Sequence, residues 1–173
     1  PPGSTFKTVT TAAIIENDYG DVVYNDTNGQ YVIKSEDGNP NNDYICRNEF
    51  KKYTYGETNL KKAFTVSSNV YFAHLSTLLS ERALQKNAEN FMFNKKIPFD
   101  LPVVTSTFQN GKMTGAQKVM SSIGQGQTEA TPLHLALIAA TIANDGVMPK
   151  PYIVSKIKSG SLTVMEADKS NLG

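Results

Sequence analysis

Apolar residues recur at the three- and four-residue spacing of amphipathic helices in several parts of the chain. The first such stretch covers residues 4–17 and carries one apolar stripe, formed by Phe6, Val9, Ala13 and Ile14. Three more helices are expected further on: one that uses Thr58 as its N-cap, one from about Val70, and one over residues 81–93. Most of the helices expected in the first two thirds of the chain thus lie between residues 58 and 93.

The clearest helix begins at Thr131 and Pro132, because a capping hydroxyl followed by proline at the first helical position is a strong start pattern. A dense apolar run follows, and Gly146 is the natural place for this helix to end. Prolines at 98 and 102 indicate an irregular stretch that runs on to Gly111.

Strand patterns are short and confined to two regions. Residues 18–54 are polar and rich in Asn, Asp, Gly and Tyr, and their β-prone runs at 22–24 and 31–33 flank Asn28-Gly29, which predicts a hairpin within a long polar insertion. Residues 152–164 alternate around Ser159-Gly160 and predict a second hairpin. We expect residues 1–173 to belong to one domain, with 18–54 as a polar region that combines a loop and a hairpin.

Composition narrows the functional classes. The 173 residues are 39% hydrophobic and 19% charged, which suits a single globular domain, and a net charge of +1 gives no footprint for nucleic acid. Cys46 is the only cysteine, so neither an internal disulfide nor a cysteine metal cage is possible, and we interpret it as an inert thiol. The two histidines, His74 and His134, lie on separate segments and offer little for a metal site or a Ser-His-Asp triad; we take His134 as structural.

The chain starts at Pro1 without an initiator Met, a basic leader or an apolar run of membrane-spanning length. We therefore interpret the sequence as part of a longer polypeptide. Any targeting segment would precede residue 1.

Ser4-Thr5-Phe6-Lys7 places a hydroxyl and an amine three positions apart, so that on a helix they share one face. A serine hydroxyl needs a base before it becomes a good nucleophile, and a poorly solvated lysine can be that base. The helix N-terminus also places partial positive charge where an oxyanion would develop. The spacing alone is equally compatible with a capping serine and a solvated lysine.

Ser67-Ser68-Asn69 lies at the junction of two expected helices, where a loop can present Ser67 and Asn69 together. A hydroxyl there can relay a proton between the lysine amine and a leaving amine, and a carboxamide can orient the lysine and a substrate amide. Taken alone, the segment also fits an N-capping serine beside an exposed asparagine.

Together these segments resemble the penicillin-binding protein family, whose transpeptidase domains carry S-x-x-K and S-x-N segments. Pro2-Gly3-Ser4-Thr5-Phe6-Lys7 is similar to the nucleophile segment, and residues 63–72 to the second segment, with Ser68 in its middle position. Residues 122–127, followed by 131–133 and 143–146, resemble the later part of the monofunctional class B enzymes. The glycines around Gln125 suggest a loop with special backbone angles.

The resemblance implies an α+β fold, namely the mainly helical portion of the serine β-lactamase and penicillin-binding protein transpeptidase fold, with most of the central antiparallel sheet missing from this chain. It implies a peptidoglycan D,D-transpeptidase that acts on D-Ala-D-Ala stem peptides through a serine acyl-enzyme. The implied roles are Ser4 as nucleophile, Lys7 as general base, Ser67 as proton relay and Asn69 as hydrogen-bonding partner of lysine and substrate.

The implied partners are peptidoglycan stem peptides, β-lactam antibiotics and the cell-wall synthesis machinery, with no nucleic acid and no metal or organic cofactor. The implied location is the extracytoplasmic face of the bacterial cell membrane, with an anchor upstream of this chain.

The family's third segment, Lys-Thr-Gly or Lys-Ser-Gly, has two imitations here. Lys158-Ser159-Gly160 follows Gly146 too closely and is better explained as a turn, and residues 112–115 carry an intruding Met113. We therefore expect this segment outside the chain and expect residues 1–173 alone to be inactive.

Two alternatives share the resemblance. A serine β-lactamase would need a base for water, yet no glutamate lies between Glu89 and Glu129, and Asn69 stands where class D enzymes and β-lactam sensors usually have an aliphatic residue. A non-catalytic scaffold module has no physical need to retain Ser4, Lys7, Ser67 and Asn69. The transpeptidase is therefore the favoured interpretation.

Overall fold

The computed structural model describes residues 1–49 and 53–172 of the chain. A short 3-10 turn, η1 (Gly3–Phe6), leads directly into helix α1 (Lys7–Glu16). The other helices are α2 (Leu60–Thr65), α3 (Asn69–Leu78), α4 (Glu81–Asn90), α5 (Gly115–Ser122) and α6 (Pro132–Ala143). The strands are β1 (Tyr24–Asp26), β2 (Gln30–Ile33), β3 (Tyr44–Arg47), β4 (Gly56–Thr58), β5 (Lys156–Ser159) and β6 (Leu162–Glu166), and a second 3-10 turn, η2, covers Pro40–Asn42.

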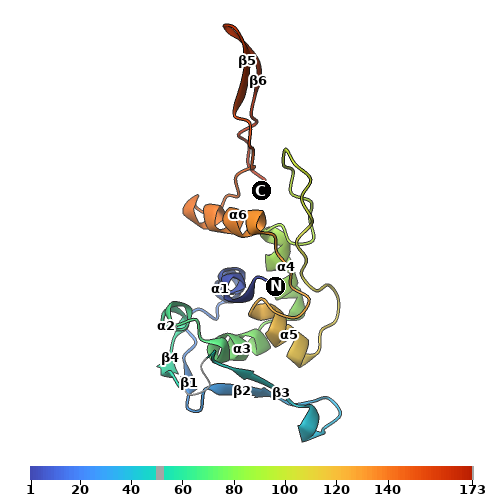
Figure 1. The fold of residues 1–173 in the computed structure, drawn as a ribbon. Coiled ribbons are helices and arrows are strands. Elements are labelled where there is room, and N and C mark those ends of the chain that lie inside the picture. Colours follow the sequence, from blue (N-terminus) through green and yellow to red (C-terminus); the bar gives the residue numbers. More distant parts are fainter. Residues whose placement is uncertain (50–52, 173) are drawn as a thin grey trace.

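Helix α1 is the centre of the molecule (Figure 1). It packs against α3 and α4, while α3 packs against α5 and carries β1, β2 and β3 on another side. Helix α6 lies across α1 from α3, and the β5–β6 pair projects from it as a narrow arm (Figure 1). The strands form three separate antiparallel pairs, so the described residues are a helical body with strands only at its margins.

The core reaches the turn that carries Ser4. Phe6 is 1% exposed, its ring stacks on Phe108 with centroids 5.3 Å apart, and the edge of Phe93 meets it at 5.2 Å. Such aromatic pairs add about 0.5–1.5 kcal/mol beyond the burial of their area. The turn that carries Ser4 is thus held in place by Phe93 and Phe108, which lie about ninety to one hundred residues further along the sequence.

Most helix predictions are confirmed. Helix α6 begins at the expected cap, where Thr131 Oγ1 accepts a hydrogen bond from the His134 backbone N–H at 3.2 Å. It ends with Asp145 in the left-handed region and a hydrogen bond from Gly146 N to Thr141 O at 2.9 Å, which is a Schellman end. His134 is buried, and its Nε2 donates to the Phe91 carbonyl at 2.6 Å, so this histidine is structural as predicted.

Two helix predictions were incomplete. Helix α2 is capped by Asn59, whose Oδ1 accepts from Lys62 N at 2.9 Å, and not by Thr58, which is the last residue of β4. Helix α5 was not predicted at all. Its start is a capping box, in which Thr114 and Gln117 satisfy each other's backbone N–H groups, and this pattern is readable from sequence.

The hairpin expected around Asn28-Gly29 is wrong. Strand β1 pairs with β4 and strand β2 pairs with β3, so neighbouring β-prone runs do not pair with each other. The reason is the buried carboxylate of Asp26, which accepts a hydrogen bond from Gly29 N at 2.7 Å and from Asn48 Nδ2 at 2.8 Å. These bonds turn the chain after β1 and bring its partner from further along.

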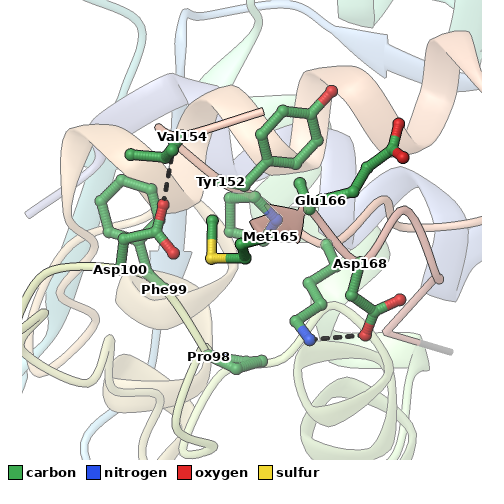
Figure 2. A pocket seen from close by; sticks show the side chains of 11 residues that line it. Pro98, Phe99, Asp100, Tyr152, Val154, Met165, Glu166 and Asp168 are labelled. Carbon is green, nitrogen blue, oxygen red and sulfur yellow. Dashed lines mark hydrogen bonds and ion pairs between the residues drawn. The ribbon is translucent and has the colours of Figure 1, made fainter. Parts of the chain in front are cut away.

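The second hairpin is confirmed. Strands β5 and β6 pair around Ser159-Gly160, where Gly160 has a φ of +61°, and every residue of both strands is exposed. At the base of this arm lies a pocket of about 330 Å³, shown in Figure 2. Asp100 closes one side of the pocket by accepting hydrogen bonds from Ile153 N at 2.6 Å and Val154 N at 3.2 Å.

Candidate active site

Ser4 and Lys7 occupy the turn that leads into α1, as the sequence predicted. Ser4 is exposed, whereas Lys7 is only 2% exposed although its side chain ends in an ionisable amine. Lys7 Nζ lies 3.2 Å from Ser4 Oγ and 5.5 Å from the centroid of the Phe72 ring. The arrangement therefore combines an accessible hydroxyl with a buried amine one turn away.

The Ser67–Asn69 turn supplies the remaining partners of this amine. Lys7 Nζ lies 2.8 Å from the Ser67 carbonyl oxygen, 3.0 Å from Ser67 Oγ and 2.6 Å from Asn69 Oδ1. Ser67 adopts a φ of +55°, a conformation that is uncommon for a residue other than glycine. This backbone angle lets both oxygens of one residue face the same amine.

Burial lowers the pKa of Lys7 from about 10.5 to about 8, because the charged form loses its hydration. Cys46 and Glu49 act in the opposite direction and raise this pKa, but their effect is smaller. A lysine with such a pKa is partly neutral near physiological pH. The site therefore holds an amine that can accept a proton.

The orientation of the Asn69 amide follows from its two neighbours. Its Oδ1 accepts from Lys7, and its Nδ2 donates to the Arg47 carbonyl oxygen at 2.9 Å. Sequence reasoning missed Arg47, because a main-chain carbonyl leaves no trace in the residue type. Behind this contact lies Cys46, and burial raises the pKa of its thiol to about 11, which keeps the group protonated and agrees with the inert thiol expected from sequence.

The loop after α5 clamps the Ser4 turn from the other side. Gly3 N donates to Gly124 O at 2.9 Å, and Thr10 Oγ1 donates to Ser122 O at 2.6 Å. A Cβ at Gly124 would lie 2.1 Å from the Gly3 carbonyl oxygen, and its φ is +73°, so only glycine fits there. The special backbone angles predicted around Gln125 are thus present at Gly124 and at Gly126, where φ is +65°.

Neither imitation of a third segment reaches the four site residues. Lys158, Ser159 and Gly160 lie at the tip of the exposed β5–β6 arm. Residues 112–115 lead into α5, with Thr114 as its N-cap and Gly115 as its first residue. No hydrogen bond found in residues 1–49 and 53–172 connects either segment to Ser4, Lys7, Ser67 or Asn69. The pocket in Figure 2 is likewise lined by other residues.

In residues 1–49 and 53–172, no group of three or more His, Cys, Asp and Glu side chains is arranged to hold a metal ion. Nor is any described helix both long and apolar enough to cross a membrane.

The penicillin binding protein transpeptidase domain model matches residues 1–172, so this chain belongs to that family. The matched range includes the polar segment 18–54. The fold class expected from sequence is confirmed, because the helices and short antiparallel strand pairs superpose on solved members of the family.

Curated relatives include the peptidoglycan D,D-transpeptidase PbpA of Mycolicibacterium smegmatis, which is 32% identical over 170 residues, or 95% of this chain and 33% of that protein. PbpA of Mycobacterium tuberculosis is 32% identical over 166 residues, or 94% of this chain and 32% of that protein. The chain thus spans about a third of the length of the curated relatives it matches.

Among solved structures, the penicillin G acyl-enzyme complex of penicillin-binding protein A from M. tuberculosis superposes with a TM-score of 0.85. It is 30% identical, and the match covers 99% of this chain and 39% of that chain. A D,D-transpeptidase domain from Eggerthella lenta gives a TM-score of 0.77 at 27% identity, covering 98% of this chain and 43% of that chain.

Proposed function

We propose that this chain carries the nucleophile, general base and proton relay of a peptidoglycan D,D-transpeptidase that works through a serine acyl-enzyme. The observation that carries the proposal is the buried Lys7 amine, which lies 3.2 Å from Ser4 Oγ and has a pKa lowered to about 8. The substrate class is the D-Ala-D-Ala end of a peptidoglycan stem peptide.

The hydrogen bonds of Lys7 support the neutral amine as the reactive form. Asn69 Oδ1 and the Ser67 carbonyl can only accept, and they take the two N–H groups that a neutral amine has. Its lone pair is then free for the hydroxyl proton of Ser4. In the acylation step Ser4 Oγ attacks the carbonyl carbon of the penultimate D-Ala, and Lys7 Nζ takes the proton from Oγ.

Ser67 completes the proton path. Its Oγ lies 3.0 Å from Lys7 Nζ, so it can pass a proton from the ammonium to the nitrogen of the departing D-Ala. The peptide C–N bond then breaks, and the acyl group stays on Ser4. An acceptor amine then attacks this ester, and its proton passes through Ser67 Oγ to Lys7 Nζ. The bond between the acyl carbon and Ser4 Oγ breaks as Lys7 Nζ returns a proton to Ser4 Oγ, which releases the cross-link amide and restores the enzyme.

The developing oxyanion requires backbone donors. The Ser4 N–H belongs to the first turn of a helix, whose N–H groups lack partners within the helix, and the helix dipole adds partial positive charge there. The strand with the family's third segment is expected to supply the second donor and to align the substrate. We place that strand in the portion of the relatives that this chain does not span.

The names of the relatives support the assignment as a peptidoglycan D,D-transpeptidase. Two are named peptidoglycan D,D-transpeptidases, and solved neighbours are described as acyl-enzyme complexes with ceftriaxone, imipenem and penicillin G. We propose that the whole protein likewise reacts with β-lactams, works with the cell-wall synthesis machinery, and acts on the extracytoplasmic face of the bacterial membrane.

The test is release of D-Ala from a synthetic stem pentapeptide by the full-length protein, with and without an acceptor amine. A transpeptidase should form a new amide with the acceptor, whereas a β-lactamase should instead hydrolyse penicillin with rapid turnover and give no such amide. Absence of both acylation and D-Ala release would favour the non-catalytic scaffold and overturn the proposal.

A further inference from the structure

A buried chain of polar side chains connects the strand region to the Ser67–Asn69 turn. Its members are Asp26 at the end of β1, Asn48 just after β3, and Ser68 in the turn itself, and they are 1%, 2% and 0% exposed. Buried polar groups are costly unless each finds its hydrogen-bond partners. Three such residues in contact, with no part in the proposed chemistry, require an explanation.

Asn48 is the hub of this chain. Its Oδ1 lies 3.3 Å from Ser68 Oγ and 3.2 Å from Val70 N, and both of these groups donate to it. Its Nδ2 donates to Asp26 Oδ2 at 2.8 Å and to the Tyr53 carbonyl at 2.9 Å. The amide therefore uses two acceptor and two donor positions, and the carboxylate of Asp26 fixes which way it faces.

Asp26 holds the hub in place. Its Oδ1 accepts from Gly29 N at 2.7 Å, and its Oδ2 accepts from Tyr55 N at 3.3 Å as well as from Asn48. Backbone donors from two separated loops thus converge on one carboxylate. A carboxylate held by several N–H groups is a rigid anchor, because charge-assisted hydrogen bonds are about twice as strong as neutral ones.

The turn needs such support. Ser67 is in the left-handed region, with a φ of +55°, where residues other than glycine are strained. Ser68 Oγ also caps α3 by accepting from Tyr71 N at 3.1 Å, and Arg47 O holds the Asn69 amide. Arg47 and Asn48 are consecutive, so the end of β3 and the residue after it accept hydrogen bonds from two neighbouring residues of the turn.

We propose that Asp26 and Asn48 are positioning residues of the transpeptidase, which hold the Ser67–Asn69 turn so that its oxygens face Lys7. The inference rests on the proposed function, because that function gives the Lys7 contacts their purpose. It also gives the polar segment 18–54 a task, since both residues lie within it.

The test compares Asn48→Leu with wild type in the full-length protein. The leucine side chain has a similar volume but cannot form hydrogen bonds. The Ser67–Asn69 turn should therefore loosen, and water should reach Lys7. Loss of desolvation raises the pKa of Lys7, and the remaining titratable neighbours that act on it, Cys46 and Glu49, are unchanged. We expect acylation by a fluorescent penicillin at pH 7 to fall roughly 10-fold to 100-fold, with its pH midpoint about one unit higher.

Asn87→Leu is the matched control. Asn87 is also an asparagine 2% exposed, and its Nδ2 donates to Glu16 at 2.7 Å, at the far end of α1 from Lys7. The Asn87→Leu variant should have a lower melting temperature but the same pH midpoint of acylation as wild type. Equal effects of the two variants on rate and midpoint would mean that Asn48 is merely structural, and would overturn the proposal.

A charge exchange provides the rescue. Asn48→Asp alone places two carboxylates side by side and should slow acylation by at least as much as Asn48→Leu. Combining it with Asp26→Asn removes the second carboxylate and restores one donor–acceptor pair between the two side chains, so it should recover part of the lost rate. No recovery from a folded double variant would contradict the proposal.

The titration of Lys7, followed by carbon NMR, separates this inference from the function. If wild type is acylated but Asn48→Leu changes neither rate nor Lys7 titration, the positioning role is wrong. If wild type is not acylated, the function is wrong, and an upward shift in the Lys7 titration in Asn48→Leu alone would still support the positioning.

Discussion

At the scale of single residues, the proposed reaction depends on Lys7, which we assign as the general base. A lysine that is 2% exposed and surrounded by four oxygen atoms would be an expensive way to hold a permanent charge. The lowered pKa of Lys7 reduces this cost, because the amine can be neutral. A neutral amine still donates to the Ser67 carbonyl and to Asn69 Oδ1, and it retains a lone pair. Burial of Lys7 therefore also provides the neutral amine that the proposed reaction requires.

The first prediction is that Lys7→Met preserves the fold and slows acylation by about 100-fold to 10,000-fold, since methionine fills a similar apolar volume but cannot take a proton. Lys7→Arg should be nearly as slow, because a guanidinium does not deprotonate in proteins. Stopped-flow acylation with a chromogenic β-lactam measures both. Lys118→Met is the control. The Lys118 amine donates to the Leu79 carbonyl at 3.0 Å, so this variant should be acylated as fast as wild type.

The second prediction concerns Glu49, whose negative charge raises the pKa of Lys7. Glu49→Gln removes that charge, so the pKa of Lys7 should fall below about 8 and more of the amine should be neutral at a given pH. The pH profile of acylation should therefore move to lower pH. Glu57→Gln, in strand β4, should leave the profile in place, and a shift to higher pH in Glu49→Gln would contradict the sign of this effect.

At the scale of elements, the Ser4–Lys7 turn is hydrogen-bonded to two other segments, namely the loop after α5 and the Ser67–Asn69 turn. The loop acts through Gly3 and Gly124, and the turn acts through the Lys7 amine. Helix α5 thus matters for the site although it contributes no reactive group.

The third prediction is that Gly124→Ala displaces the Ser4 turn. The new Cβ would lie 2.1 Å from Gly3 O and 2.8 Å from Phe6 Cβ, so backbone has to move. We expect it to cost about 1–3 kcal/mol more than Gly146→Ala, a glycine with a φ of +88° and no atom within 4 Å of its added Cβ. Denaturant unfolding measures this difference, and equal costs would show that the close approach is unimportant.

Prediction from sequence succeeded where the determinants are local. The cap at Thr131 and the apolar stripe of α1 lie within or next to the helices that they predict. Ser4 and Lys7 are likewise only three positions apart, so their proximity could be read from one turn of sequence. The capping box at Thr114 was equally local and could have revealed α5. The pairing of β1 with β4 depends on Asp26 and Asn48, which are 22 positions apart, and no local pattern encodes such a contact.

At the scale of the whole molecule, the described body leaves apolar surface without a partner. One groove is lined by Thr8, Thr11, Ala12, Ile15, Phe64 and Ile142, with Ile15 at 58% and Ile142 at 56% exposure. The β5–β6 arm exposes further apolar side chains, among them Leu162 and Val164. Since the relatives are about three times longer, the remainder of their domain is the expected cover.

The fourth prediction is that residues 1–173 expressed alone are not labelled by a fluorescent penicillin under conditions that label the full-length protein. Loss of a single oxyanion donor typically costs about 100-fold to 1000-fold in rate, and the third segment is expected elsewhere. The uncovered apolar groove should also cause self-association, which light scattering detects. Labelling at the full-length rate would mean that Lys158-Ser159-Gly160 must be reconsidered as the third segment.

We propose Ser4 as the nucleophile, because Ser4 carries an exposed hydroxyl that shares a helix turn with a buried lysine of lowered pKa. Treating the full-length protein with penicillin, digesting it and mapping the adduct by mass spectrometry tests this most directly. We predict the acyl group on the peptide that contains Ser4, and its loss in Ser4→Ala. An adduct on Ser67 or Ser159, or an adduct that persists in Ser4→Ala, would contradict the account.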